Sequence, residues 1–251
     1  MTARTAAWHC PPKTVLVGVD FGDASAHALA IADVVAAGFN ARLRVLHAER
    51  FEPPPYFTVE QIDRLEAERH AAQAAAVAHL TQFANRTSGY VAEAIVADET
   101  PVDALLREAV TTDLIVLGTH GRRGPGRWWL GSVAERVVRA AVVPVLVTRA
   151  DMTAPREVFE RLVLVQDGTD ADASALMCAE HFAGLARGSV TKAGPPGKCD
   201  AAMLRQASLV IMPTPSDRTW IFSDSVTRIL GGCDRPVLFI PTRLAEKETT
   251  S

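Results

Sequence analysis

The sequence predicts an α/β protein made of two tandem open parallel sheets, the second of them truncated. Apolar strand-like runs alternate with helical segments from residue 13 to residue 149, which is typical of a parallel sheet covered by helices. The same pattern begins again at residue 161. A glycine-rich loop also lies between a predicted buried strand and a predicted helix.

In the first half the alternation starts with a strand from Thr14 to Val19, whose residues are apolar throughout, as in a strand buried on both faces. A helix follows from Ala24 to Ala37, closed by Gly38 as its C-cap. Further strands are expected over residues 42–47, 90–96, 113–117 and 143–148. Further helices are expected over residues 58–88, 101–109 and 132–140.

Two of these helices carry clear start signals. Thr58 and Gln61 form a capping box for the long helix. Thr100 caps the next helix and Pro101 occupies its first turn.

Four segments of the second half repeat segments of the first. They are 161–167, which repeats the first strand, 208–212, which repeats the fourth strand, 225–230, which repeats the helix at 132, and 236–239, which repeats 144–147. One strand and the long helix have no counterpart. The expected organisation is a flexible N-terminus (1–12), a first unit (13–149), a linker (150–160), a degenerate second unit (161–242) and a polar tail (243–251).

The glycine-rich loop follows the apolar run 114–117, and glycines stand at positions 118, 121, 124, 126 and 131. Glycines leave backbone N–H groups unshielded, and Ser132 opens a helix that runs to about Ala140. An anion could therefore bind at the positive end of that helix.

The spacing G-x2-G-x9-G-S, with Val15 to Asp20 as an opening strand with an acidic end, resembles the nucleotide-binding signature of the universal stress protein family. The resemblance covers nearly all of the first 150 residues and returns, degraded, in the rest. It implies an ATP-binding first half and a second half that serves as a built-in dimerisation partner through pairing of the last strands, with a homodimer as a further option. It also implies a nucleotide-dependent sensor or regulator of the stress response, with an unknown protein partner.

Ligands of open α/β sheets bind beyond the carboxyl ends of the strands, at the point where the strand order reverses. In the family's fold that point lies between the first and fourth strands. Asp20 is then expected to accept hydrogen bonds from ribose hydroxyls or to hold a phosphate-bound Mg²⁺ or Mn²⁺. The adenine slot is expected to be lined by Val19, Leu117 and His47. The phosphates are expected to be surrounded by Gly118, His120, Gly121, Gly131, Ser132 and Val133, with positive charge from Arg122.

The second half departs from this signature at three positions. Gly118 is matched by Pro213, Gly121 by Ser216 and Gly131 by Asp224. Proline has no N–H, and an aspartate at the helix N-terminus takes the place of a phosphate. One nucleotide per chain is therefore expected.

Composition excludes several other classes. A net charge of −3 gives no electrostatic reason to bind nucleic acid or an anionic membrane. The four cysteines are far apart in the sequence and form no CxxC pair, which favours reduced thiols and a cytoplasmic location over a disulfide framework or a zinc site.

No general base is evident near the expected γ-phosphate, so no catalytic residue is assigned and ATP hydrolysis is expected to be slow or absent. Two alternatives remain open. One is a structural interaction module with a vestigial nucleotide site, docking through Trp128 and Trp129. The other is a nucleotide-dependent transferase or pyrophosphatase.

Overall fold

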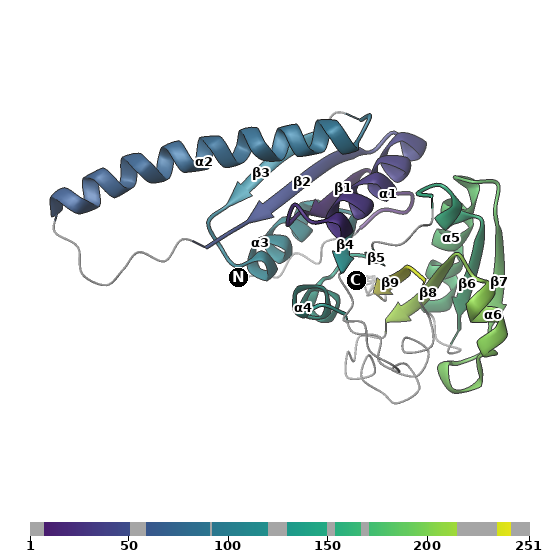
Figure 1. Cartoon of the computed structure of the whole chain (residues 1–251). Coiled ribbons are helices and arrows are strands. Elements are labelled where there is room, and N and C mark those ends of the chain that lie inside the picture. The colour runs from purple at the N-terminus through teal and green to yellow at the C-terminus, as the bar shows by residue number, and fades with distance from the viewer. Residues whose placement is uncertain are drawn as a thin grey trace, which may run out of the picture.

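The computed structural model describes residues 8–50, 59–90, 92–119, 130–149, 154–166, 171–214 and 235–241. Within these ranges nine strands form a single sheet with helices packed on its faces (Figure 1). The strands are β1 (Thr14–Gly18), β2 (Arg42–Ala48), β3 (Ala92–Ala97), β4 (Leu114–Thr119), β5 (Val145–Arg149), β6 (Arg161–Val165), β7 (Ser189–Ala193), β8 (Leu209–Thr214) and β9 (Val237–Pro241). The α-helices are α1 (Asp23–Phe39), α2 (Val59–Thr87), α3 (Pro101–Glu108), α4 (Ser132–Ala140), α5 (Ala171–Gly184) and α6 (Ala201–Gln206). Short 3₁₀ turns are η1 (Ala109–Thr111), η2 (Glu157–Phe159) and η3 (Pro196–Lys198).

The strand order β3-β2-β1-β4-β5-β9-β8-β6-β7 joins the two expected sheets edge to edge. Neighbouring strands are parallel except for β5 and β9, which run antiparallel. In that pair Leu146 lies opposite Leu238, its counterpart in the sequence repeat. The two parallel sheets expected from the sequence are thus halves of one continuous mixed sheet.

The strand order repeats on the two sides of this joint. The order β2-β1-β4-β5 is matched by β7-β6-β8-β9. Just beyond β1 the Val19 amide donates to the Leu46 carbonyl (2.8 Å), and just beyond β6 the Gln166 amide donates to the Ala193 carbonyl (3.2 Å). Within the described ranges, β3 and α2 have no counterpart in the second half. The domain boundary at residues 150–160 stays a prediction.

The helices of the first half lie on both faces of its sheet. Helix α1 packs against α2, and α3 packs against α4. Right-handed crossovers between parallel strands place α1 and α2 on one face and α3 and α4 on the other (Figure 1). Thr100 caps α3 as predicted, with its side chain accepting from the Asp103 amide. The predicted capping box at Thr58 lies outside the described residues.

The predicted C-cap of α1 is wrong. The helix continues to Phe39, and Asn40, at φ 52° and ψ 42°, takes the left-handed cap position that asparagine tolerates. Gly38 instead lies where α1 approaches the second half, because a Cβ atom there would be only 2.3 Å from Leu185 Cδ2. The sequence pattern could not show this long-range contact.

The end of the predicted linker belongs to the core. Val158 and Phe159 in η2 are fully buried. Phe159 stacks on Phe182 of α5 with ring centroids 5.9 Å apart, and Phe39 of α1 meets Phe182 edge-on at 5.6 Å. These aromatic contacts join the first half to the second.

The last residues of the expected flexible N-terminus are packed rather than free. Trp8 is only 2% exposed. Asp113 Oδ1 accepts from the amide and from the ring Nδ1 of His9, both at 2.8 Å. Asp113 Oδ2 accepts from the amides of Lys13 (2.9 Å) and Thr14 (3.0 Å). One buried carboxylate therefore holds residues 8–13, called here the N-terminal segment, at the start of β4.

The cysteines also correct the sequence prediction. Cys10 in the N-terminal segment and Cys178 in α5 form a disulfide, with Cα atoms 5.8 Å apart. The sequence could not indicate this pair because 168 positions separate the two residues. Cys199 is a free thiol, and Cys233 lies outside the described residues.

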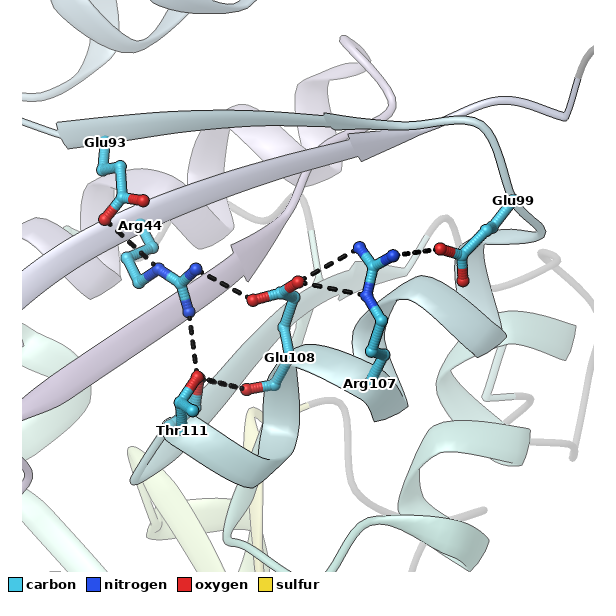
Figure 2. A network of polar contacts seen from close by, with 7 residues as sticks. Arg44, Glu93, Glu99, Arg107, Glu108 and Thr111 are labelled. Atoms are coloured by element: carbon cyan, nitrogen blue, oxygen red, sulfur yellow. Dashed lines mark hydrogen bonds and ion pairs between the residues drawn. The ribbon is translucent and has the colours of Figure 1, made fainter.

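A polar network fixes α3 against the sheet (Figure 2). Arg44 of β2 pairs with Glu108 at the end of α3 (2.8 Å) and donates to Thr111 Oγ1 (3.3 Å). Arg107 pairs with both Glu108 and Glu99. Because Arg44 and Glu108 are mostly buried, these bonds hold α3 in place where it borders the pocket described below.

None of the helices in the described part of the chain has the length and apolarity needed to span a bilayer.

Candidate functional site

A pocket opens at the carboxyl ends of β1 and β4, where the strand order reverses. It contains about 570 Å³ of space not filled by atoms, part of which is open solvent. Strands β1, β2 and β4 and helices α1, α3 and α4 contribute its lining. The lining residues are Gly18, Val19, Asp20, Ser25, Leu46, His47, Ala48, Pro101, Leu105, Leu117, Gly118, Val133 and Ala134.

Two glycines allow the strand ends to pack closely around this space. A Cβ atom on Gly118 would lie 2.2 Å from the carbonyl oxygen of Ala24 in α1. A Cβ atom on Gly18 would lie 2.7 Å from Leu117 Cδ2. Gly118, predicted as a phosphate-binding position, therefore also has a steric reason to be glycine that is independent of any ligand.

A hydrogen-bonded turn presents Asp20 at the pocket. The Gly22 amide donates to Asp20 Oδ1 (3.0 Å), and the Asp20 amide donates to Ser25 Oγ (3.4 Å). The buried Ser25 hydroxyl donates in turn to the Gly22 carbonyl (2.9 Å). Ser25 was not among the predicted site residues, although a hydroxyl in the first turn of the helix after an acidic strand end was an available signal.

His47 lies on the pocket wall with its ring orientation fixed. Its Nδ1 atom is 2.9 Å from the Val19 carbonyl oxygen. Because a carbonyl can only accept, Nδ1 carries the proton and donates. When the imidazole is neutral, Nε2, which lies 3.8 Å from Glu49 Oε2, is the acceptor of the ring.

Phe21, directly after Asp20, has a left-handed backbone with φ 63°, which costs a non-glycine residue roughly 1–2 kcal/mol. Its ring stacks on His79 (centroids 4.4 Å apart), lies 4.5 Å from the His47 ring and meets Phe83 edge-on at 5.5 Å. These rings tie the loop after β1 to β2 and α2 and offset the backbone cost. Neither Phe21 nor His79 was assigned a role from the sequence.

The N-terminal turn of α4 borders the pocket. The helix begins at Ser132 as predicted, and Gly131 is its N-cap with φ −55°. The Gly131 amide donates to Thr119 Oγ1 (3.0 Å). Val133 and Ala134 line the pocket, while Gly131 and Ser132 are exposed beside it. The positive end of the helix dipole is therefore next to the pocket.

The structure brings together the predicted site residues that it describes. Those lining the pocket are Val19, Asp20, His47, Leu117, Gly118 and Val133. Outside the described residues lie His120, Gly121, Arg122, Trp128 and Trp129. The sequence missed Gly18, Ser25, Leu46, Ala48, Pro101, Leu105 and Ala134, most of which are apolar or small wall residues without a motif. Within the described ranges, no three His, Cys, Asp or Glu side chains lie close enough together to hold a metal ion.

Comparison with known proteins identifies the first half. Residues 12–149 match the family described as "Universal stress protein family". A universal stress protein from Thermus aquaticus is 34% identical over 146 residues, which cover 55% of this chain and 98% of that protein. A universal stress protein from Mycobacterium tuberculosis strain H37Rv is 33% identical over 147 residues, covering 56% of this chain but only 46% of that relative. The chain thus matches about half the length of the mycobacterial relative.

The whole fold is also similar to a solved structure. The crystal structure of a universal stress protein from Archaeoglobus fulgidus has a TM-score of 0.70 with this chain. The match covers 92% of this chain and 98% of that chain at 17% identity. This likeness concerns the fold, including the second half that the family match does not reach.

Proposed function

The chain belongs to the universal stress protein family, and on that premise we propose that it binds one adenine nucleotide, ATP, as a sensor or regulator in the stress response. The observation that carries this proposal is the pocket at which Asp20, Gly118 and the N-terminal turn of α4 converge. A ribose is bound by an acidic side chain at a strand end. A phosphate is bound by a helix N-terminus next to a close-packed glycine.

The pocket supports one orientation of the nucleotide. The adenine ring lies between Val19 and Leu117, next to His47. The ribose hydroxyls donate to Asp20. The same carboxylate can also bind a divalent cation that is coordinated by the phosphates. The phosphates lie toward Gly118 and the first turn of α4, on the positive end of the helix dipole.

The lining favours binding over catalysis. Asp20 and His47 are its titratable side chains within the described residues. His47 donates its Nδ1 proton to a backbone carbonyl, and Asp20 already accepts from Gly22. Neither is placed as a free general base, so we expect ATP hydrolysis to be slow and the bound nucleotide to act by biasing a surface that a partner protein recognises.

The substitution Gly131→Asp tests this proposal because it copies Asp224 of the second half into the first. Gly131 has φ −55°, which aspartate adopts without strain, and aspartate is favourable at an N-cap. The new carboxylate repels a phosphate at α4, so we expect ATP affinity to fall at least about tenfold, or about 1.4 kcal/mol. Titration calorimetry measures the affinity, and circular dichroism checks the fold.

The matched control is Gly131→Ala, which adds the same Cβ atom, 3.2 Å from Thr119 Oγ1, without a charge. It should keep ATP binding. If Gly131→Asp folds and binds ATP as the wild type does, the phosphate site lies elsewhere. If the wild type binds no nucleotide, the interaction-module alternative is favoured, and conversion of excess ATP into product would favour the transferase or pyrophosphatase.

A further inference from the structure

Cys10 of the N-terminal segment lies next to Cys178 of the second half. We propose that Cys10 and Cys178 are an oxidant-reactive thiol pair, in which Cys10 reacts with a hydroperoxide and Cys178 then forms the disulfide that fastens the N-terminal segment to α5. The substrate class is hydrogen peroxide or a small organic hydroperoxide. The inference does not depend on nucleotide binding.

The backbone places the two residues for this reaction. Their Cα atoms are 5.8 Å apart, within the range of about 4.4–6.8 Å found in protein disulfides. Cys178 is 1% exposed, whereas Cys10 is only partly buried. A small cavity open to solvent borders both cysteines and is lined further by Trp8, Phe182 and Leu238. A small oxidant can thus reach Cys10 first, and Cys178 is positioned as the resolving residue.

The N-terminal segment holds Cys10 in place without help from the disulfide. Asp113 accepts hydrogen bonds on both sides of Cys10, from His9 before it and from Lys13 and Thr14 after it. Trp8 is buried at the other end of the segment. We therefore expect the reduced protein to keep the two thiols close, so that the bond can form and break repeatedly.

The chemistry balances in two steps. The Cys10 thiolate attacks one peroxide oxygen, an S–O bond forms and the O–O bond breaks. The leaving group, hydroxide from hydrogen peroxide or an alkoxide from an organic hydroperoxide, takes a proton to become water or an alcohol. The Cys178 thiolate then attacks the Cys10 sulfur, an S–S bond forms, the S–O bond breaks, and the leaving hydroxide takes a proton and departs as water. The two thiols lose two electrons and two protons to the peroxide, and a dithiol reductant reverses the change by thiol–disulfide exchange.

Cys199 provides an internal contrast. Burial raises the pKa of its thiol, and its Sγ donates to the Gly194 carbonyl (2.8 Å). Because the thiolate is the reactive form, the raised pKa should slow the reaction of Cys199 with an oxidant. No other cysteine of the described residues lies at the junction of the two halves.

The disulfide would fasten the N-terminal segment to the second half. Cys10 lies in the N-terminal segment, which Asp113 holds at β4 of the first half, and Cys178 lies in α5 of the second half. The disulfide therefore links the two halves across the β5–β9 joint. Asp113 and Thr14 mark the amino ends of β4 and β1, the opposite edge of the sheet from the pocket. Oxidation should therefore stabilise the docking of the two halves without altering the pocket.

The test uses the full chain, reduced with a dithiol, freed of reductant and treated with hydrogen peroxide. Alkylation and mass spectrometry of a non-reduced digest should show a Cys10–Cys178 peptide pair, while Cys199 still takes the alkylating reagent. The oxidised wild type should melt about 4–16 °C above the reduced wild type, the shift expected for a disulfide in a chain of this size. Cys10→Ser and Cys178→Ser should each abolish both the peptide pair and the shift, whereas Cys199→Ser should change neither.

Three results would overturn the proposal. Cys10 and Cys178 could remain alkylatable after peroxide, either could pair with Cys199 or Cys233 instead, or the oxidised and reduced wild type could melt at the same temperature. The comparison of oxidised and reduced wild type needs no variant to fold. The result of this comparison can also be interpreted whether or not the chain binds a nucleotide.

Discussion

In the second half of the sheet, β6 and β8 are the counterparts of β1 and β4. The residues at the carboxyl ends of these two strand pairs differ. Val15 of β1 pairs with Leu114 of β4, and Leu162 of β6 pairs with Leu209 of β8. When these two pairs are aligned, Gly18 corresponds to Val165 and Gly118 corresponds to Pro213. The strand order is the same on both sides. The second half thus keeps the strands of the first but replaces the two glycines that lie at the pocket.

Each replacement has a physical consequence. Val165 is 2% exposed, so a buried side chain stands at the position where Gly18 lets Leu117 approach closely. Pro213, paired with Ile240 in β9, has no amide to offer an anion. The β6–β7 register, compared with the β1–β2 register, also places Gly194, which has no side chain, at the position of His47. The second half therefore keeps the strand order of the first, although the residues that match Gly18, Gly118 and His47 differ.

The largest expected effect comes from Gly118→Ala, because its Cβ atom would meet the backbone of Ala24, which cannot move aside as a side chain can. We expect the free energy of unfolding to fall by about 1–3 kcal/mol. Urea denaturation measures this change. The matched control is Gly89→Ala, where a Cβ atom meets nothing within 4 Å and the change should stay within about 0.5 kcal/mol. Equal stability of the two variants would show that α1 does not depend on glycine at the end of β4.

The second effect comes from Gly18→Val, which copies Val165 into the first half. The nearest atom to the new side chain is the flexible end of Leu117, so the chain should still fold while the pocket narrows. We expect ATP affinity to fall about tenfold, or about 1.4 kcal/mol, when measured by calorimetry. A folded variant with unchanged affinity would mean that the nucleotide does not bind between β1 and β4.

The sequence predicted the elements of the fold better than the contacts between them. Strand and helix positions follow from local periodicity, and Ser132 and Thr100 were correctly placed as helix-start signals. The Asn40 cap and the Cys10–Cys178 bond depend on the approach of segments far apart in the chain, which local patterns do not contain. Within the site, Asp20 and Gly118 belong to a sequence motif and could be predicted. Wall residues such as Leu105 could not, because they reach the pocket only through the packing of α3 on the sheet.

The third and smallest effect concerns Phe21, whose repeat counterpart is Gly168 when Asp167 is matched with Asp20. Phe21→Ala removes the ring contacts and keeps the left-handed strain, whereas Phe21→Gly removes both. Phe21→Gly should therefore be more stable than Phe21→Ala by about 1 kcal/mol, since φ near 60° is unfavourable for alanine. Urea denaturation of the two variants checks this order, and a more stable alanine variant would contradict the role given to the positive φ.

The central claim is that one half of the chain binds ATP and the other half does not. Titration calorimetry of the wild-type chain with ATP tests it most directly, because the stoichiometry counts sites regardless of their affinity order. We predict one ATP per chain, since Gly18 and Gly118 occur only in the first of the two matched strand pairs. Two ATP molecules per chain would contradict the account, because Val165 and Pro213 would then have failed to close the second site.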